Sequence, residues 1–255
     1  MIMAGPFPPV IENAGAGSRV VLVCEHASNV IPPRWGDLGL TEAQRRAHIA
    51  WDPGALGLAR GLAARLGAML VHAPVSRLVY DLNRAPDMAG AMPARSEIHD
   101  IPGNAAISPA ERAERTAAIY VPFHDGLHAL LMDRIARGLA PVMVTIHSFT
   151  PVYHGKPRAV EFGVIHDADA TLPRAILREA KRQTALRAEM NEPYSAKDDV
   201  THTLRVHATP YGLPNAMLEI RNDLIASQAA EAAMADRLAP VIAAAVAALT
   251  PETVS

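Results

Sequence analysis

Residues 19–24 read RVVLVC and residues 141–147 read PVMVTIH, and these two stretches decide the fold. Each is a nearly continuous apolar run with little polar alternation, which is typical of a strand buried on both faces of a sheet. Such strands need helices above and below them. The sequence therefore predicts an α/β protein.

Further helices and strands are expected to alternate along the chain. Hydrophobic periodicity predicts helices at 41–66 (broken near Pro53), 108–137 (kinked at Pro122, ending at Gly138), 171–188 and 224–248. Shorter apolar runs predict strands at 69–73, 76–80, 160–165, 204–208 and 216–220, and polar stretches predict loops at 85–107, 150–158 and 189–203. Because 69–73 and 76–80 are too close for a crossover, part of a mostly parallel sheet is expected to be antiparallel.

Composition excludes several classes of protein. The chain has 255 residues, half of them apolar, which favours one domain at 19–255 after a flexible arm at 1–18. A net charge of −2 and 4% aromatic residues give no sign of nucleic-acid or membrane binding. No signal peptide and no apolar run of spanning length is evident, so a cytoplasmic location is expected. The oligomeric state is left open.

Polar residues stand where the predicted strands end. His26 follows the first run, His147 ends the second, and Glu219 lies in the run 216–220. Arg84 lies shortly after the run 76–80, and Arg221 directly follows the run 216–220. Because sites in open α/β sheets lie beyond the carboxyl ends of the strands, these side chains are expected to meet at one edge.

This set of side chains suits metal-assisted hydrolysis. Neutral imidazoles bind Zn²⁺ well, and a carboxylate often completes a three-ligand catalytic site. The metal lowers the pKa of its bound water to about 7. An unligated glutamate can take the proton, and arginines can hold a substrate carboxylate. We expect His26 and His147 to bind Zn²⁺ or another divalent metal.

The third metal ligand is harder to assign. Asp52 lies four residues after His48 and shares its face of the predicted helix. Glu25 is next to His26, but on a strand it points to the opposite face. Asn29 has a useful spacing but is a poor ligand. Asp52 is therefore favoured.

Each of these candidate residues can instead have a purely structural role. A strand-end histidine can simply be hydrogen-bonded, Glu219 can pair with Arg221, and Asp81 can form a salt bridge with Arg84. Two further candidates are weak.

The first is the pair His124 and His128, which have a metal-like spacing of four without an intervening glutamate. The second is Cys24, the single cysteine, which is expected to be a buried hydrophobe rather than a nucleophile.

Five longer segments together resemble the N-formylglutamate amidohydrolase family, in the family's order and across about residues 19–230. They are VLVCEHASNVIP (21–32), SRLVYDLNR (76–84), YVPFH (120–124), TIHSFTPV (145–152) and MLEIRNDLI (217–225). The resemblance implies a zinc-dependent exopeptidase-like fold, a three-layer α/β/α sandwich around a mixed sheet. It also implies hydrolysis of the amide of an N-acyl amino acid, with N-formyl-L-glutamate giving L-glutamate and formate in the named activity.

The resemblance carries residue roles as well. His26 and His147 are similar to the family's metal-binding histidines, and Glu219 is similar to its catalytic glutamate. Asn83 and Arg84 are similar to an Asn-Arg pair that holds a substrate carboxylate. The sequence departs from the family pattern in two places: Asn29 stands where a glutamate ligand is expected, and EHAS (25–28) replaces PHSG.

We therefore predict a metal-dependent hydrolase of a small N-acyl amino acid. Glu219 acts as general base and then acid, Arg77 or Arg221 helps to hold substrate carboxylates, and His124 stabilises the oxyanion. The alternatives are a non-catalytic carboxylate-binding protein with the same fold and a zinc peptidase for short peptides. A cysteine hydrolase using Cys24 is the most distant one.

Overall fold

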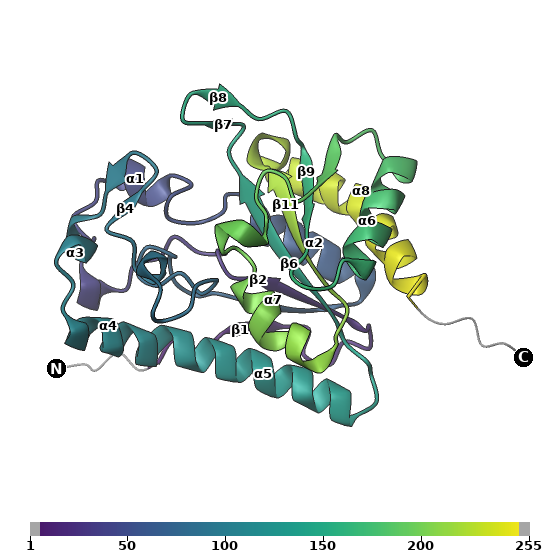
Figure 1. The fold of residues 1–255 in the computed structure, drawn as a ribbon, viewed down its shortest axis with the longest axis horizontal. Helices are drawn as coiled ribbons and strands as arrows, with labels where there is room; N and C mark the ends of the chain where they lie inside the picture. Colours follow the sequence, from purple (N-terminus) through teal and green to yellow (C-terminus); the bar gives the residue numbers. More distant parts are fainter. Residues whose placement is uncertain (1–5, 250–255) are drawn as a thin grey trace, which may run out of the picture.

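A seven-stranded sheet runs through the part of the chain that the computed structural model describes, residues 6–249 (Figure 1). In spatial order its strands are β1 (Val10–Glu12), β3 (Met69–His72), β2 (Val20–Cys24), β6 (Val142–Phe149), β11 (Asn215–Arg221), β9 (Phe162–Ile165) and β10 (Ala188–Met190). Strands β3, β2, β6 and β11 are parallel to one another. β1 is antiparallel to β3, β9 is antiparallel to β11, and β10 is parallel to β9. The predicted mixed, mostly parallel sheet is confirmed.

Helices cover both faces of this sheet (Figure 1). On one face lie α2 (Ala55–Leu66), α6 (Thr171–Gln183) and α8 (Gln228–Ala247). On the other lie α5 (Val121–Ala136) and α7 (His202–His207). Alternate residues of β2 serve the two layers: Leu22 packs toward α2 and α8, whereas Val23 packs toward α5. Fully apolar strands therefore form the middle layer of an α/β sandwich.

Short elements fill the connections. They are α1 (Glu42–Arg46), α3 (Pro102–Ala105), α4 (Pro109–Arg115), η1 (Pro33–Trp35), η2 (Ala89–Ala91), η3 (Thr116–Tyr120), η4 (Ala196–Asp198), η5 (Thr209–Tyr211), η6 (Asn222–Ile225), and the hairpins β4 (Arg95–Ser96) with β5 (His99–Asp100) and β7 (Val152–Tyr153) with β8 (Lys156–Pro157). None of the helices within residues 6–249 combines the length and apolar character that crossing a bilayer needs.

The helix predicted at 108–137 is confirmed as one rod made of α4, η3 and α5. Ser108 caps its start by accepting a hydrogen bond from the Glu111 backbone N–H. A π-helical segment, η3, precedes Pro122, whose missing N–H takes one hydrogen bond out of the helix. Gly138 follows the last turn with a φ of +73°.

Two predicted strands are wrong. Residues 76–80 form a turn, because the Ser76 hydroxyl donates to the Ala50 carbonyl and accepts from the Leu78 N–H. Residues 204–208 belong mostly to α7, because Leu204 and Ala208, four residues apart, pack on the same core. The helix predicted at 171–188 ends at residue 183, and strand β10 (188–190) takes the place of the predicted helix end and the start of the predicted loop.

The expected N-terminal arm, residues 1–18, contains an ordered strand. β1 pairs with β3 and forms one edge of the sheet, and the Phe7 N–H donates to the Ala118 carbonyl. Residues 1–5 of the arm and residues 250–255 of the predicted domain lie outside the described residues. The division into an arm and a single domain stays a prediction.

Candidate functional site

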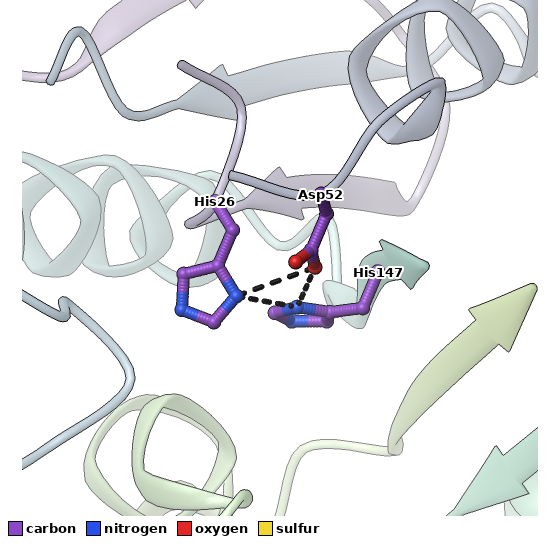
Figure 2. Close-up of side chains that lie close together, drawn as sticks. All are labelled: His26, Asp52 and His147. Carbon is purple, nitrogen blue, oxygen red and sulfur yellow. Dashed lines mark hydrogen bonds and ion pairs between the residues drawn. The ribbon is translucent and has the colours of Figure 1, made fainter. Parts of the chain in front are cut away.

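Three buried side chains from separate parts of the chain point at one another: His26, Asp52 and His147 (Figure 2). The two Nδ1 atoms of the histidines lie 3.2 Å apart. Asp52 Oδ2 lies 3.3 Å from Nδ1 of His26 and 3.0 Å from Nδ1 of His147. The group is therefore a compact triangle of two nitrogens and one oxygen, which could hold a metal ion.

The fold brings these three residues together at the ends of parallel strands. His26 follows β2, and His147 lies in β6, its neighbour in the sheet. Asp52 comes from the turn before α2, where its backbone N–H donates to the His26 carbonyl at 2.9 Å. Gly54 allows this turn because its φ is +80° and a Cβ there would lie 2.3 Å from the Ile225 carbonyl oxygen.

Asp52 is thus in the predicted group, but for a different geometric reason. The predicted helix at 41–66 stops at Arg46 and resumes at Ala55, so Asp52 and His48 share no helix face. His48 Nε2 still lies 3.7 Å from Asp52 Oδ1 and 2.8 Å from the Ser148 carbonyl oxygen. Asp52 therefore reaches the site from a turn that is hydrogen-bonded to His26 at the end of β2.

A second pair of carboxylates holds the far sides of the two imidazoles. Asp81 Oδ1 lies 2.7 Å from Nε2 of His26. Glu25 Oε2 lies 3.1 Å from Nε2 of His147. The Asp81 carboxylate accepts a hydrogen bond from His26, so it selects the tautomer of His26 in which Nε2 carries the proton and Nδ1 presents a lone pair. The negative charge of Glu25 beside Nε2 of His147 favours a proton at that nitrogen as well.

The donor set fits a divalent cation. Two imidazole lone pairs and the Asp52 carboxylate oxygen face one point, and without a proton or a cation between them they repel one another. Their separations of 3.0 to 3.3 Å are close to the spacing of about 3.3 Å between ligand atoms around tetrahedral Zn²⁺. The three residues present therefore match a metal site of the His₂-carboxylate type.

Negative charge is in excess around this point. Four buried carboxylates gather here, whose members are Glu25, Asp52, Asp81 and Glu219. Of the described side chains, the Arg77 guanidinium pairs with two of them, at 2.7 Å from Asp81 and 3.4 Å from Asp52. Buried charge is costly unless compensated, so the site favours positive charge at its centre.

The pKa shifts agree with this charge balance. Burial would lower the pKa of His147, but the Glu25 and Asp52 carboxylates outweigh burial and raise it. Burial would raise the pKa of Asp52, yet the two histidines hold it well below its usual range. Arg77 and His26 likewise outweigh burial and lower the pKa of Asp81. Both aspartates therefore favour the ionised form, and Asp52 offers a negatively charged ligand to a cation.

Glu219 lies beside the triangle and behaves differently. In the pairing of β6 with β11 it is the direct partner of His147. Burial raises its pKa to about 7, and its Oε2 has no hydrogen-bond partner among the described residues. A carboxylate with a pKa near neutrality and an unused oxygen can accept a proton and release it again.

A cavity of about 170 Å³ opens over these residues. Its walls include the triangle, Glu219, Asn83 and Arg84, so the structure brings these predicted residues to one place. Asn83 accepts from the Thr203 N–H and donates to the Val200 carbonyl, and Arg84 donates to the carbonyls of Asp198 and Asp199. The Asn-Arg pair thus also holds the loop before α7.

The two other predicted arginines have structural partners. Arg77 lines the cavity, but its charge is matched by the aspartates that hold His26 and complete the triangle. Arg221 is not among the residues that line the cavity. It pairs with Asp223 at 2.8 Å and does not pair with Glu219. Neither position favours a role in holding the substrate.

His124 also lies away from the cavity. Its Nδ1 lies 2.7 Å from Nε2 of His207, and its Nε2 lies 3.0 Å from the Leu82 carbonyl oxygen. Burial, His207 and His202 lower its pKa to about 3. This neutral ring supports the segment before Asn83, and its position outside the cavity wall does not favour the predicted oxyanion role.

The weaker candidates also have structural explanations. His128 and His124 do not join a described metal-ligand group. Cys24 is fully buried on the α2 and α8 side of the sheet, and burial raises the pKa of its thiol. Asn29 donates to the Arg45 carbonyl. These placements do not favour a cysteine hydrolase or a fourth ligand.

Sequence reasoning missed the supporting carboxylates. Glu25 was expected to face away from His26, and it does serve a different histidine, on the next strand. The sequence suggests Arg84 as a partner of Asp81, whereas the partners of Asp81 are His26 and Arg77. The signal that points to both is their position directly after a strand or turn at the same sheet edge.

Comparisons with known proteins agree with the family resemblance of the sequence. A model of the N-formylglutamate amidohydrolase family matches residues 18–226. The crystal structure of gene product Atu2144 from Agrobacterium tumefaciens is 50% identical in sequence, covers 96% of this chain and of that chain, and has a TM-score of 0.93. A structure of N-formylglutamate amidohydrolase from Ralstonia eutropha JMP134 is 18% identical, covers 92% of this chain and 95% of that chain, and shares the fold with a TM-score of 0.66. Among curated proteins no match was found.

Proposed function

This chain belongs to the N-formylglutamate amidohydrolase family, a family of hydrolases that act on a non-peptide amide, and from that premise we propose that it is a Zn²⁺-dependent hydrolase of small N-formyl amino acids. The observation that carries the proposal is the buried triangle of His26, Asp52 and His147 beside Glu219. A donor triangle of this kind next to a titrating carboxylate is the arrangement that hydrolysis of an amide needs.

His26, Asp52 and His147 are the residues that would hold the metal. When bound, a divalent cation supplies an acidified water and polarises the substrate carbonyl. Glu25 and Asp81 keep the two imidazole rings turned so that both Nδ1 atoms face the same point. The burial of all five side chains keeps these contacts out of competition with solvent water.

Glu219 is proposed to move the proton. Its free Oε2 accepts the proton of the attacking water, and the same carboxyl group then donates a proton to the leaving amine nitrogen. A pKa of about 7 suits both halves of this cycle in the absence of further charge. Asn83 and Arg84 line the same cavity and are proposed to orient the substrate carboxylate.

The test is hydrolysis of an N-formyl amino acid panel by zinc-loaded and chelator-stripped protein. Wild-type protein is expected to release formate only when loaded, and Glu219→Gln is expected to keep the metal but lose about 10²- to 10⁴-fold in kcat. Glu189→Gln, a change at the exposed residue of strand β10, is the matched control.

Other results point to the alternatives. Binding of amino acids without turnover of any panel member would support a non-catalytic binding protein. Faster cleavage of dipeptides than of formyl amino acids would support a peptidase. Full activity of Glu219→Gln would remove Glu219 from the reaction.

A further inference from the structure

Two buried histidines, His124 on α5 and His207 at the end of α7, lie against each other outside the wall of the cavity. Their helices are neighbours on one face of the sheet (Figure 1). The two rings are nearly parallel, with planes inclined by 6° and centres 5.0 Å apart, and Nδ1 of His124 lies 2.7 Å from Nε2 of His207. The reaction proposed above uses neither ring.

The partners of these rings fix the positions of their protons. Nε2 of His124 lies 3.0 Å from the Leu82 carbonyl oxygen, which can only accept, so Nε2 carries a proton. Burial and neighbouring histidines lower the pKa of His124 to about 3 and that of His207 to about 4, so both rings are neutral near pH 7. Nδ1 of His124 is then an acceptor, and Nε2 of His207 donates to it. A chain of two hydrogen bonds therefore runs from α7 to Leu82.

The free nitrogen at the end of this chain agrees with the assignment. Nδ1 of His207 is buried and has no hydrogen-bond partner among the described residues. In the direction given above, this atom carries a lone pair. In the reverse direction it would be a buried N–H without an acceptor, and the Leu82 carbonyl would face a lone pair of His124. Buried unpaired N–H groups are rare in folded proteins, so the first direction is favoured.

The carbonyl that His124 holds belongs to a peptide group of the site. The same peptide group contains the Asn83 N–H, which donates to Oδ1 of Asp81 at 3.0 Å. That oxygen also lies 2.7 Å from Nε2 of His26. A peptide group is planar and rigid, so fixing its oxygen also fixes the direction of its N–H. His124 is therefore linked to the orientation of His26 through one rigid plane and one carboxylate.

The helix α7 that carries the second histidine is itself firmly held. The hydroxyls of Thr201 and Thr209, at its two ends, donate to the two carboxylate oxygens of Asp167 at 2.9 and 2.8 Å. Within the helix, the Thr203 N–H donates to Oδ1 of Asn83 at 3.0 Å. The side chain of Asn83 and the peptide group before it are thus supported from the same fixed helix.

We propose that His124 is a positioning residue, which holds the Leu82–Asn83 peptide group so that Asp81 stays on His26 and Asn83 stays at the cavity wall. The proposal rests on the proposed function, because it concerns a metal ligand and a substrate-binding residue of that site. His124 touches neither metal nor substrate. It is expected to affect both metal affinity and substrate binding, since the peptide group that it holds lies between the residues responsible for each.

The first experiment uses two substitutions that each keep one of the hydrogen bonds of His124. Glutamine places an amide N–H near the position of Nε2 and can still donate to Leu82, whereas asparagine places its amide near Nδ1 and reaches only His207. On zinc-loaded protein, His124→Asn is expected to weaken Zn²⁺ binding about tenfold and to raise KM for N-formyl-L-glutamate about tenfold. His124→Gln is expected to stay within about threefold of wild type in both. Chelator competition and formate release measure these quantities.

The matched controls are His128→Asn and His128→Gln, one turn further along α5. The His128 ring lies 5.7 Å from that of Tyr211, and both changes are expected to leave zinc affinity and KM unchanged. Equal losses in His124→Asn and His124→Gln would show that the volume of the ring matters rather than its bond to Leu82. Wild-type values in His124→Asn would also overturn the proposal.

The second experiment needs neither metal nor turnover, and so separates this proposal from the proposed function. Amide hydrogen exchange at Asn83 reports on its N–H bond to Asp81, and the amides of β6 report on global stability. In metal-free protein, exchange at Asn83 is expected to be about tenfold faster in His124→Asn than in His124→Gln, with β6 alike in the two.

The exchange result and formate release together distinguish the two ideas. The expected exchange pattern without hydrolysis of any formyl amino acid would keep the positioning role and reject the hydrolase. Equal exchange at Asn83 in the two variants, together with rapid formate release by wild type, would do the reverse.

A measurement on wild type remains decisive where a variant is poorly folded. Nitrogen NMR of the imidazoles is expected to find the proton of His124 on Nε2, and a proton on Nδ1 instead would overturn the proposal.

Discussion

Glu25 directly follows strand β2, His147 lies in the neighbouring parallel strand β6, and the Glu25 carboxylate lies 3.1 Å from Nε2 of His147. His26, the very next residue, uses a different carboxylate, Asp81. The two imidazoles of the triangle are therefore oriented independently. This arrangement makes Glu25 a positioning residue whose effect can be measured on metal affinity.

We expect Glu25→Gln to weaken Zn²⁺ binding by about 10- to 100-fold, because glutamine keeps the size of the side chain but lacks the charge that increases the basicity of His147. Competition with a chromophoric chelator measures this affinity. Glu42→Gln, exposed on α1, is the control. An unchanged zinc affinity in Glu25→Gln would show that the contact with His147 has no effect on the metal.

Glu219 gives a prediction about stability and pH in the metal-free protein. Burial raises the pKa of this carboxyl from 4.5 to about 7, so the folded state binds its proton more tightly than the unfolded chain does. The stabilising effect of the bound proton is complete below about pH 4.5 and is lost as the pH rises through 7. The folded protein therefore pays a desolvation penalty in alkaline solution.

Glu219→Gln removes that penalty. We expect it to raise the free energy of unfolding of the metal-free protein at pH 8 by up to about 3 kcal/mol, and by much less at pH 4.5. Urea unfolding followed at both pH values tests this. A gain of equal size at both values would mean that ionisation of Glu219 does not set its contribution to stability.

Gly54 links the fold to the site. A methyl group here would meet the Ile225 carbonyl oxygen at 2.3 Å, and the φ of +80° is unfavourable for any side chain. We expect Gly54→Ala to lower the free energy of unfolding by more than about 2 kcal/mol and to weaken metal binding by moving Asp52.

Gly17→Ala is the matched control for this change, because a methyl group at Gly17 meets nothing within 4 Å. Its free energy of unfolding is expected to stay within about 0.5 kcal/mol of wild type. Thermal unfolding and chelator competition are measured on both variants. A stable Gly54→Ala protein with normal zinc affinity would separate this turn from the site.

Much of the sheet is predictable because the amino-acid composition of its central strands shows that they are buried. RVVLVC and PVMVTIH are apolar on both faces and can be stable only between two layers of helices. The errors fall where a side chain overrides the pattern, as at Ser76, whose hydroxyl forms a turn. The segment at 204–208 alternates like a strand, but Leu204 and Ala208 also match one helix face, and packing against the core decides the outcome.

The site is predictable in part, for a related reason. The ends of parallel strands must meet at one edge, and this brings His26, His147 and Glu219 together. Asp52 enters through a turn whose path depends on Gly54, and no local periodicity encodes that path. Arg158 follows the β7–β8 hairpin outside the central sheet, so the cavity wall that it shares with Arg84 becomes evident only in three dimensions.

The donors of the triangle are spread widely over the chain, at positions 26, 52 and 147, and Glu219 follows much later. A ribosome releases these segments in that order, so a nascent polypeptide that stops before β6 has two donors and no complete site. The group of three donors that could hold a metal ion is therefore complete only after β6 has been synthesised.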